Sequence, residues 1–241
     1  MELPLPELDV LWEDLGLGDV PFPLEIPGHG RTLEERARIR AGVHDGLGDR
    51  GDAAGPMLRL LARPEVTVDL VAQLDGRMVR AVAAGRGRHA VRAVQLDRSV
   101  VLTRIRDTAV ISSVVDLLPV SRPGPGRSVT LPVSALGRGA RSGVLRPAGG
   151  PTNHGVERQL VASVMERPLR RVGQLGIMLR DDRGWRRLPG LAWLDTDQGR
   201  YASTVRRGPD GEDWTTLTPT DNAQLAYRLS EMLAAARTRV R

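Results

Sequence analysis

The apolar residues near the start of the chain are spaced as in a helix. Ile39, Val43 and Leu47 lie four residues apart, which places them on one face of a helix. Thr32 and Glu35, just ahead of this run, fit a capping box in which each side chain satisfies a free N–H group of the first turn. A helix that begins after residue 32 is therefore predicted, and a second, shorter one follows over about residues 54–62.

From residue 66 the spacing of apolar residues changes to two, which is typical of half-buried strands. The dipeptide Asp75-Gly76 favours a tight hairpin turn, and such short links imply an antiparallel meander. A helix over about 107–118, ended by Pro119, closes this half of the chain. The predicted strands are 66–74, 78–84, 90–96 and 100–106.

The same order of elements returns after a Pro/Gly-rich linker at residues 121–130. A helix is predicted over 155–167, and a last helix begins near Thr218-Pro219 with a Thr cap and Pro at its first position. The last helix carries an apolar stripe, which is more typical of a core face than of an interface. The predicted strands are 171–180, 188–194, 200–206 and 214–217, and the stripe consists of Leu225, Leu229 and Leu233.

This repeated order predicts an α+β fold with a quasi-twofold internal duplication. A large antiparallel β-sheet, made from both halves, is flanked by two helical bundles. Residues 1–241 then form a single domain, in which the halves 1–120 and 131–241 are joined by the linker 121–130. The alternative is that two unrelated halves share a common pattern by chance.

The composition predicts an aliphatic core and a protein that stays in the cytoplasm. Hydrophobic residues make up 41% of the chain, but there is only one Phe. The absence of Cys excludes disulfides, thiolate nucleophiles and Cys-based zinc sites. No apolar stretch reaches the about 18 residues of a membrane span, and no basic region precedes an apolar run as in a signal peptide. We therefore expect no membrane insertion.

The net charge of +6 comes from arginine, because the sequence contains no Lys. Arginine usage of this kind is the expected result of codon bias in a GC-rich genome. An alternative is an Arg-rich nucleic-acid-binding module, but the basic loops lack interleaved aromatic residues on which bases could stack. The charge is uneven, since residues 1–30 hold seven acidic residues and no Arg.

One motif resembles a dinucleotide-binding fingerprint. The run Gly85-Arg86-Gly87-Arg88-His89-Ala90 fits the pattern G-x-G-x-x-A and follows a predicted strand. That fingerprint requires a helix next, because the helix N-terminus holds the pyrophosphate. A strand pattern follows instead, so the run is interpreted as a hairpin turn.

No combination of residues points to catalysis, a metal or a small-molecule ligand. The four histidines do not share a metal-ligand spacing. Asp181-Asp182 and the pair Asp195 and Asp197 fall in predicted turns, where Asp is favoured for bonds to the local backbone. Gly199-Arg200-Tyr201 is interpreted as structural, with Gly turning the chain and Tyr packing at the start of a strand. The histidines are His29, His44, His89 and His154.

Several short motifs together resemble the EspG family over about residues 8–233. Thr32-Leu33-Glu34-Glu35-Arg36 leads into Arg50-Gly51 and the paired strands. Leu117-Leu118-Pro119 runs into the Pro/Gly stretch, and Gly199-Arg200-Tyr201 is followed by a Trp-Thr strand and a Thr-Pro-Thr-Asp cap. Each motif alone is weak, but their order and spacing are those of this family.

The resemblance implies a cytosolic actinobacterial chaperone of type VII (ESX) secretion and not an enzyme. Such a chaperone binds PE–PPE heterodimers at an apolar helical tip of the PPE subunit, keeps them soluble and presents them to the secretion machinery. It also implies the surface that grips the partner, namely the central sheet, the loop between its second and third strands, and the C-terminal helical bundle. The corresponding residues here are Gly85, Arg86, Gly87, Arg88, Leu225, Leu229 and Leu233.

Overall fold

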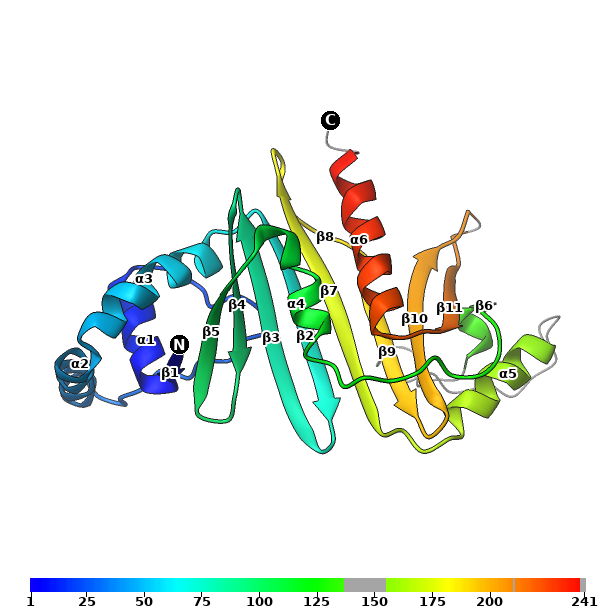
Figure 1. Cartoon of the computed structure of the whole chain (residues 1–241), viewed down its shortest axis with the longest axis horizontal. Coiled ribbons are helices and arrows are strands. Elements are labelled where there is room, and N and C mark those ends of the chain that lie inside the picture. Colours follow the sequence, from blue (N-terminus) through cyan, green and yellow to red (C-terminus); the bar gives the residue numbers. More distant parts are fainter. Residues whose placement is uncertain (137–154, 210, 239–241) are drawn as a thin grey trace. The chain divides into compact units, whose positions relative to one another are not determined.

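A computed structural model describes residues 1–136, 155–209 and 211–238, and it has an α+β fold (Figure 1). The helices are α1 (Leu5–Asp14), α2 (Leu33–Leu47), α3 (Asp49–Ala62), α4 (Ser112–Val115), α5 (Gly155–Met165) and α6 (Asn222–Thr238). The strands are β1 (Glu2–Pro4), β2 (Val66–Leu74), β3 (Arg77–Arg86), β4 (His89–Gln95), β5 (Ser99–Ile105), β6 (Val129–Pro132), β7 (Arg171–Asp181), β8 (Gly184–Arg187), β9 (Leu191–Thr196), β10 (Gly199–Arg207) and β11 (Asp213–Pro219).

Within the described ranges, these eleven strands form one large antiparallel sheet. Their order is β1-β5-β4-β3-β2-β7-β9-β10-β11-β6, and β8 pairs with β7. No helix of the described part is long and apolar enough to cross a membrane. The coarse prediction of an α+β protein with a large antiparallel sheet is therefore confirmed.

The chain divides into two compact units, which we describe separately. Unit 1 comprises Met1–Val71, Val79–Leu117 and Met178–Arg186. Unit 2 comprises Ala72–Met78, Leu118–Ile177 and Arg187–Arg241. The boundary between Leu117 and Leu118 lies close to the start of the predicted linker at residue 121. Each unit also includes a short piece from the other half of the sequence.

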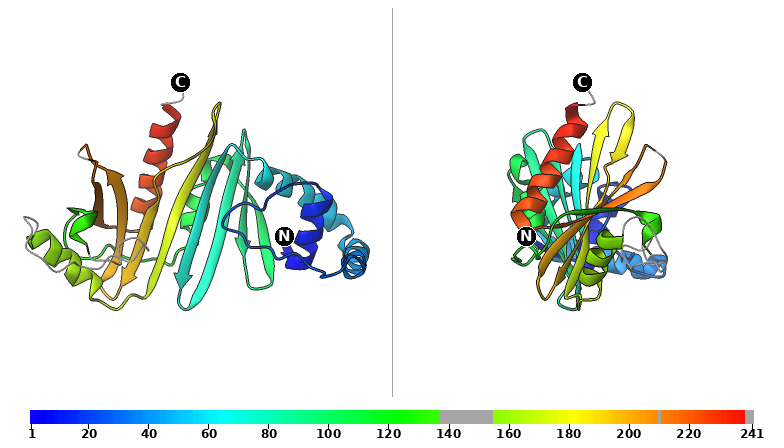
Figure 2. Two further views of the ribbon diagram at one scale, coloured as in Figure 1. Left: turned by 180° about the vertical axis from the view of Figure 1, so that it is seen from behind. Right: turned by 90° about the vertical axis from the view of Figure 1, so that its right-hand side faces the viewer.

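Unit 1 packs helices α1 and α3 against strands β4 and β5, and α2 packs against α1. Figures 1 and 2 show α1–α3 gathered beside these strands. Burying this aliphatic surface away from water is the main stabilising contribution to the unit, at about 25 cal/mol per Å². The core includes Leu8, Trp12, Leu58, Leu61, Val82, Val91 and Leu102, each no more than 5% exposed.

Charged groups join α1 to α2. Arg36 on α2 pairs with Asp9 and Glu13 on α1, and its Nε donates to Glu13 Oε2 at 2.9 Å. Burial tends to raise the pKa of the Asp9 carboxyl, but the His29 amide and the Arg36 guanidinium donate to it and bring its pKa below the usual range. Two of the four histidines also take part here, since His29 lies beside Asp9 and His44 beside Asp14.

Unit 2 has its own aliphatic core beneath α5. Strands β7, β9, β10, β11 and β6 are neighbours in that order, and α5 packs against β6. The core includes Val129, Leu131, Val161, Val164, Leu194, Tyr201 and Leu217. The apolar stripe of α6 is buried as well.

The strands joined by tight turns were predicted well. Strand β2 has the predicted bounds, and Asp75 and Gly76 form the turn after it with φ values of 48° and 85°. Positive φ at both central residues is the mirror-image turn that matches the twist of a hairpin, and Gly adopts it without steric cost. Asp75 is held there by Arg171 Nε, 2.9 Å from its carboxylate.

Other predictions need correction. Strands β1, β6 and β8 were missed because they are three or four residues long and exist only through pairing with β5, β11 and β7. The helix predicted over 107–118 is only a 3₁₀ turn followed by the four-residue α4. Thr218 and Pro219 belong to β11, and α6 is capped instead by Asp221, which accepts from the Gln224 N–H at 2.8 Å.

The segment predicted as a linker is fixed against β10. The Arg200 N–H donates to the Arg122 carbonyl at 2.9 Å, and the Gly124 N–H donates to the Arg200 carbonyl at 3.0 Å. A Cβ on Gly124 would lie 2.2 Å from the Tyr201 ring, so only Gly fits there. Tyr201 is 3% exposed and donates to the Pro125 carbonyl at 2.9 Å. Its predicted packing role is confirmed, and burial raises the pKa of its phenol.

Arg200 is completely buried and forms the main polar contact of unit 2. Its guanidinium makes a bidentate pair with Asp195, at 2.7 and 2.8 Å, and stacks 4.7 Å from the centre of the Trp193 ring. It also donates to the Pro119 carbonyl at 3.0 Å and to the Asn222 side chain. Asp195 was predicted in a turn, but it lies inside β9 with 2% exposure, because its charge is paired here.

We expect Arg200→Met to cost about 3–5 kcal/mol of the free energy of unfolding, because it leaves the Asp195 carboxylate buried with less compensation. Replacing both partners, as in Arg200→Met with Asp195→Leu, should recover much of the loss. Urea unfolding measures both changes, and Arg206→Ala, an exposed position on the same strand, is the matched control. A loss below about 1 kcal/mol for the single variant would contradict the role given to the pair.

Candidate partner-binding site

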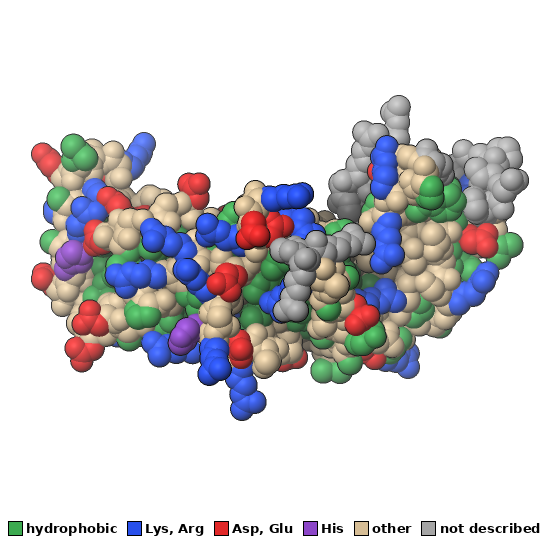
Figure 3. All heavy atoms as spheres, turned by 90° about the horizontal axis from the view of Figure 1, so that it is seen from above, with side chains coloured by type: hydrophobic (Ala, Val, Ile, Leu, Met, Phe, Trp, Pro, Cys, Tyr) green, Lys and Arg blue, Asp and Glu red, His purple; other side chains and the backbone are tan. Residues whose placement is uncertain are grey.

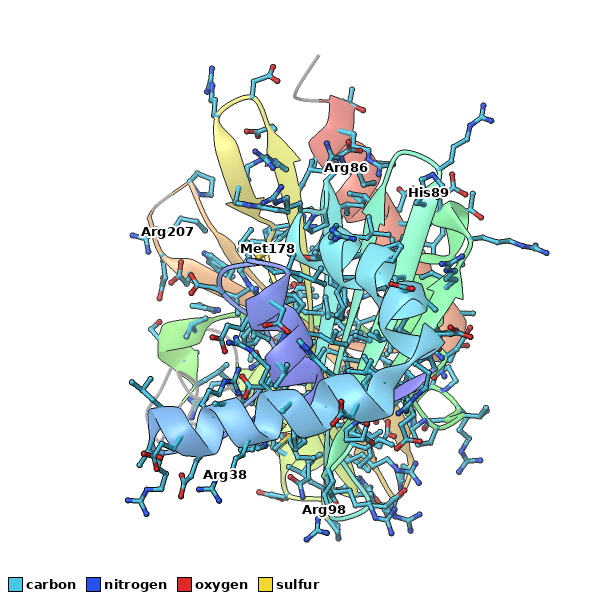
Figure 4. All side chains as sticks on the ribbon, turned by 90° about the vertical axis from the view of Figure 1, so that its left-hand side faces the viewer. Arg38, Arg86, His89, Arg98, Met178 and Arg207 are labelled. Carbon is cyan, nitrogen blue, oxygen red and sulfur yellow. The ribbon has the colours of Figure 1, made fainter. Side chains whose placement is uncertain are left out.

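The residues Gly85 to Arg88 lie at a hairpin between β3 and β4. Arg86 pairs with His89 in the ladder, and Gly87-Arg88 form the two-residue turn, with Gly87 at φ 55°. A strand, and not a helix, follows the G-x-G-x-x-A motif, so the hairpin interpretation is confirmed. Figure 4 shows Arg86 and His89 at one end of the view, with Arg38 and Arg98 at the other.

Three of the four predicted hairpin residues are exposed, but Gly85 is not. Arg86, Gly87 and Arg88 are open to solvent. Gly85 is buried inside β3, and a Cβ there would lie 3.2 Å from Val110 and 3.3 Å from Val66. Gly85 is therefore corrected to a packing residue that allows the hairpin to lie close to β2 and to the segment before α4.

Glu65 holds the hairpin in place from the start of β2. Its carboxylate accepts from the Gly87 N–H at 3.2 Å, and its second oxygen lies 3.7 Å from Arg86 Nε. Its own N–H donates to the Gly85 carbonyl at 2.9 Å. The turn thus has a defined position, while its two arginine side chains extend from it.

The hairpin forms one wall of a groove that lies entirely within unit 1. The groove has a volume of about 740 Å³, and its other walls are α3 and the end of β5. The apolar part of its lining consists of Pro56, Met57, Leu60, Ala90, Val91 and Ile105. The polar part consists of Arg59, Arg63, Glu65, Arg86, Gly87, Arg88, His89 and Arg104.

The groove is strongly basic. Among the described lining residues, five arginines face a single carboxylate, Glu65, which leaves an excess of four positive charges. Within the described part of the chain, Arg59, Arg63, Arg88 and Arg104 make no side-chain hydrogen bond or ion pair. Figure 3 shows arginine side chains interspersed with hydrophobic ones over the left-hand half of the upper face. An anionic surface with apolar side chains fits such a lining.

Sequence reasoning missed this groove because its residues come from separate segments. Arg59 lies in the last turn of α3 and Arg63 is the residue that follows the helix, so their four-residue spacing is only a weak signal in the sequence. Arg104 comes from the end of β5, about 40 residues later, and only the antiparallel pairing with β4 brings it to the same end as Arg88.

The second predicted set lies in unit 2 and is not on the surface. Leu225 and Leu229 are 0% exposed and Leu233 is 8% exposed, as the core interpretation of the stripe predicts. Their side chains are therefore core positions, and their part in partner binding stays a prediction. The exposed aromatic residue of α6 is Tyr227, at 65% exposure, which sequence reasoning passed over.

The remaining candidates have local roles. Asp181 accepts from the Arg183 N–H at 3.0 Å and pairs with Arg186 at 3.4 Å, as expected for a turn. Among the described residues, no three His, Asp or Glu side chains lie together in a way that could hold a metal ion. His154 lies outside the described residues.

The numbering of the strands on either side of the predicted loop changes in the structure. Because β1 was missed, the turn at Gly87-Arg88 lies between β3 and β4 in the complete order. The turn between β2 and β3 is Asp75-Gly76, which belongs to unit 2 and is tied to Arg171.

Comparisons with known proteins bear on the fold and on the family of this chain. A search of curated proteins finds no significant match. Among solved structures, the chain is similar to EspG5, the Mycobacterium tuberculosis type VII secretion system chaperone, in its complex with the PE25–PPE41 dimer. The identity is 14%, the match covers 97% of this chain and 95% of that chain, and the TM-score is 0.69, which shows a shared fold. The sequence model of the EspG family matches residues 4–231, nearly the whole length, so this chain belongs to the EspG family.

Proposed function

We propose that this protein is a cytoplasmic chaperone of a type VII secretion system that binds a PE–PPE-type heterodimer, keeps it soluble and delivers it for export. The observation that carries the proposal is the match over nearly the whole chain to the EspG family and to the fold of EspG5, which was solved with a PE25–PPE41 dimer bound. The role is binding and not catalysis.

We place part of the contact with the heterodimer at the β3–β4 turn. Arg86, Gly87 and Arg88 are exposed, and Glu65 holds the turn in a defined position. A turn that is already ordered loses little conformational entropy on binding, which favours affinity. Gly85 and the α6 leucines contribute to binding indirectly, because their packing supports the strand and the helix whose exposed residues would contact the partner.

We also infer that the two halves arose by duplication. In unit 1 the strand order is β1-β5-β4-β3-β2, and in unit 2 it is β6-β11-β10-β9-β7. In unit 1, the short strand β1 precedes the helices and pairs with β5, the last strand of a four-strand meander. In unit 2, the short strand β6 precedes α5 and pairs with β11, the last strand of the second meander. This shared order supports a single domain with halves 1–120 and 131–241, and it is harder to explain by two unrelated halves.

The chaperone proposal predicts a soluble complex on co-expression. With a cognate PE–PPE pair from the same genome, the chain should co-purify and elute with the pair in size-exclusion chromatography. The PE–PPE pair expressed alone is the control, and it should be less soluble. If every PE–PPE-like pair of that genome stays apart from the chain, the proposal is wrong.

The Arg-rich alternative is tested by duplex DNA. No Phe, Tyr or Trp is present among the described residues that line the basic groove, so bases have no stacking platform. We expect no tight binding to a random duplex at about 150 mM salt, where phosphate contacts are already weakened. Fluorescence anisotropy measures this, and a submicromolar dissociation constant would favour the nucleic-acid alternative.

The hairpin contact is tested by charge reversal at its tip. Arg86→Glu with Arg88→Glu should change the free energy of unfolding by less than about 0.5 kcal/mol, because both side chains are exposed. Binding of the PE–PPE pair should weaken by about tenfold or more, since a reversed charge meets a surface complementary to arginine. Thermal unfolding and calorimetry measure the two effects. Unchanged affinity would move the contact elsewhere, and a collapse of the melting temperature would mean that the turn is packed.

A further inference from the structure

We propose that the basic groove of unit 1 binds an acidic segment of the partner protein, with apolar side chains on the groove floor and several carboxylates on its arginine rim. This inference rests on the proposed function for the identity of the partner. It goes further by assigning the chemistry of the bound segment and by extending the contact to α3 and β5.

The charges of the rim require several carboxylates. The unpaired guanidiniums come from three places, with Arg59 on α3 and Arg63 directly after it, Arg88 at the turn and Arg104 on β5. One carboxylate accepts a bidentate pair from a single guanidinium. A small ligand with one acidic group would leave most of the rim without a partner, whereas a chain segment with acidic residues at intervals can pair along its length.

The floor of the groove requires apolar groups. Among the apolar lining residues, Pro56 is exposed and Leu60 and Ile105 are half-buried, so the floor presents apolar surface that a ligand can cover. Apolar side chains that cover the floor would exclude water, and ion pairs at the rim then gain strength from the lower local dielectric. A volume of about 740 Å³ lies in the range of ligand pockets, about 300–1,000 Å³, which suits a short segment and not a folded domain.

Most of the acidic residues near the N-terminus are paired within unit 1. The acidic residues near the N-terminus are the obvious internal candidates to neutralise the groove, but most are paired. Asp9 and Glu13 bind Arg36, Asp14 binds Arg40, Glu7 binds Arg50, and Glu25 binds Arg80. These five carboxylates are therefore not available to the groove, which leaves its arginines open to carboxylates of another molecule.

The decisive variant is Arg63→Glu with Arg104→Glu, which spares the hairpin tip. The neutral form, Arg63→Gln with Arg104→Gln, is a graded second variant in case the reversed charges disturb folding. The matched control is Arg38→Glu with Arg98→Glu, which changes two exposed arginines of unit 1 at the opposite end from the groove (Figure 4). Thermal unfolding of each variant shows that its fold is retained.

The first probe is a fluorescein-labelled 15-residue helical peptide with leucines at four-residue spacing and glutamates between them. Its counterpart has Gln at each Glu. We expect wild-type protein to bind the Glu peptide about tenfold or more tightly than the Gln peptide. The Glu variant should lose this preference, the Gln variant should lose part of it, and the control should retain it. Equal binding of both peptides, or binding of laurate in place of the peptides, would overturn the inference.

The second probe is the co-expressed PE–PPE pair. The Arg63→Glu and Arg104→Glu variant should lose about tenfold or more in affinity, while the control variant keeps it. If the pair binds this variant as tightly as wild type, the groove inference is wrong and the chaperone proposal stands. If no pair binds the wild type but the Glu peptide binds with the expected preference, the chaperone proposal fails and the groove chemistry stands.

Discussion

The buried pair of Arg200 and Asp195 organises unit 2, because two charges inside a protein are tolerated only when nearly every donor and acceptor is satisfied. The carboxylate occupies two of the guanidinium nitrogens, and Trp193 covers its flat face. The remaining donors reach the Pro119 carbonyl and Asn222. The path of the chain after α4 and the start of α6 are thereby set by one side chain.

The contacts of Arg200 with Pro119 and Asn222 affect both the segment that leads into the Pro/Gly stretch and the start of α6. Asn222 also donates to the Leu118 carbonyl at 3.1 Å, so the first residue of α6 is tied to the segment that precedes the Pro/Gly stretch. That stretch then follows β10, with Gly124 against the Tyr201 ring. The leucine stripe of α6, which starts from this point, lies in the core of unit 2.

Arginines of the unit 1 groove are exposed to solvent, unlike the buried Arg200 of unit 2. The groove arginines stay in water, where an unpaired guanidinium carries no desolvation cost. Their stems and the apolar floor nevertheless form a shaped surface whose charge is not neutralised from within. Arginine suits both situations, since it remains charged at any physiological pH and its planar fork matches a carboxylate whether buried or exposed. Placement alone separates structural arginines from those that are free to meet a partner.

The sequence by itself determined the local elements. Strand β2, the Asp75-Gly76 turn and the helical stripes were predicted because period, capping and turn chemistry depend on neighbouring residues. Only tertiary structure decided the rest. Strands β1 and β6 are too short to carry a period and form by pairing with distant strands. The groove joins Arg63 with Arg104, and Arg200 reaches Pro119 and Asn222, because burial and packing act between residues that are far apart in the sequence.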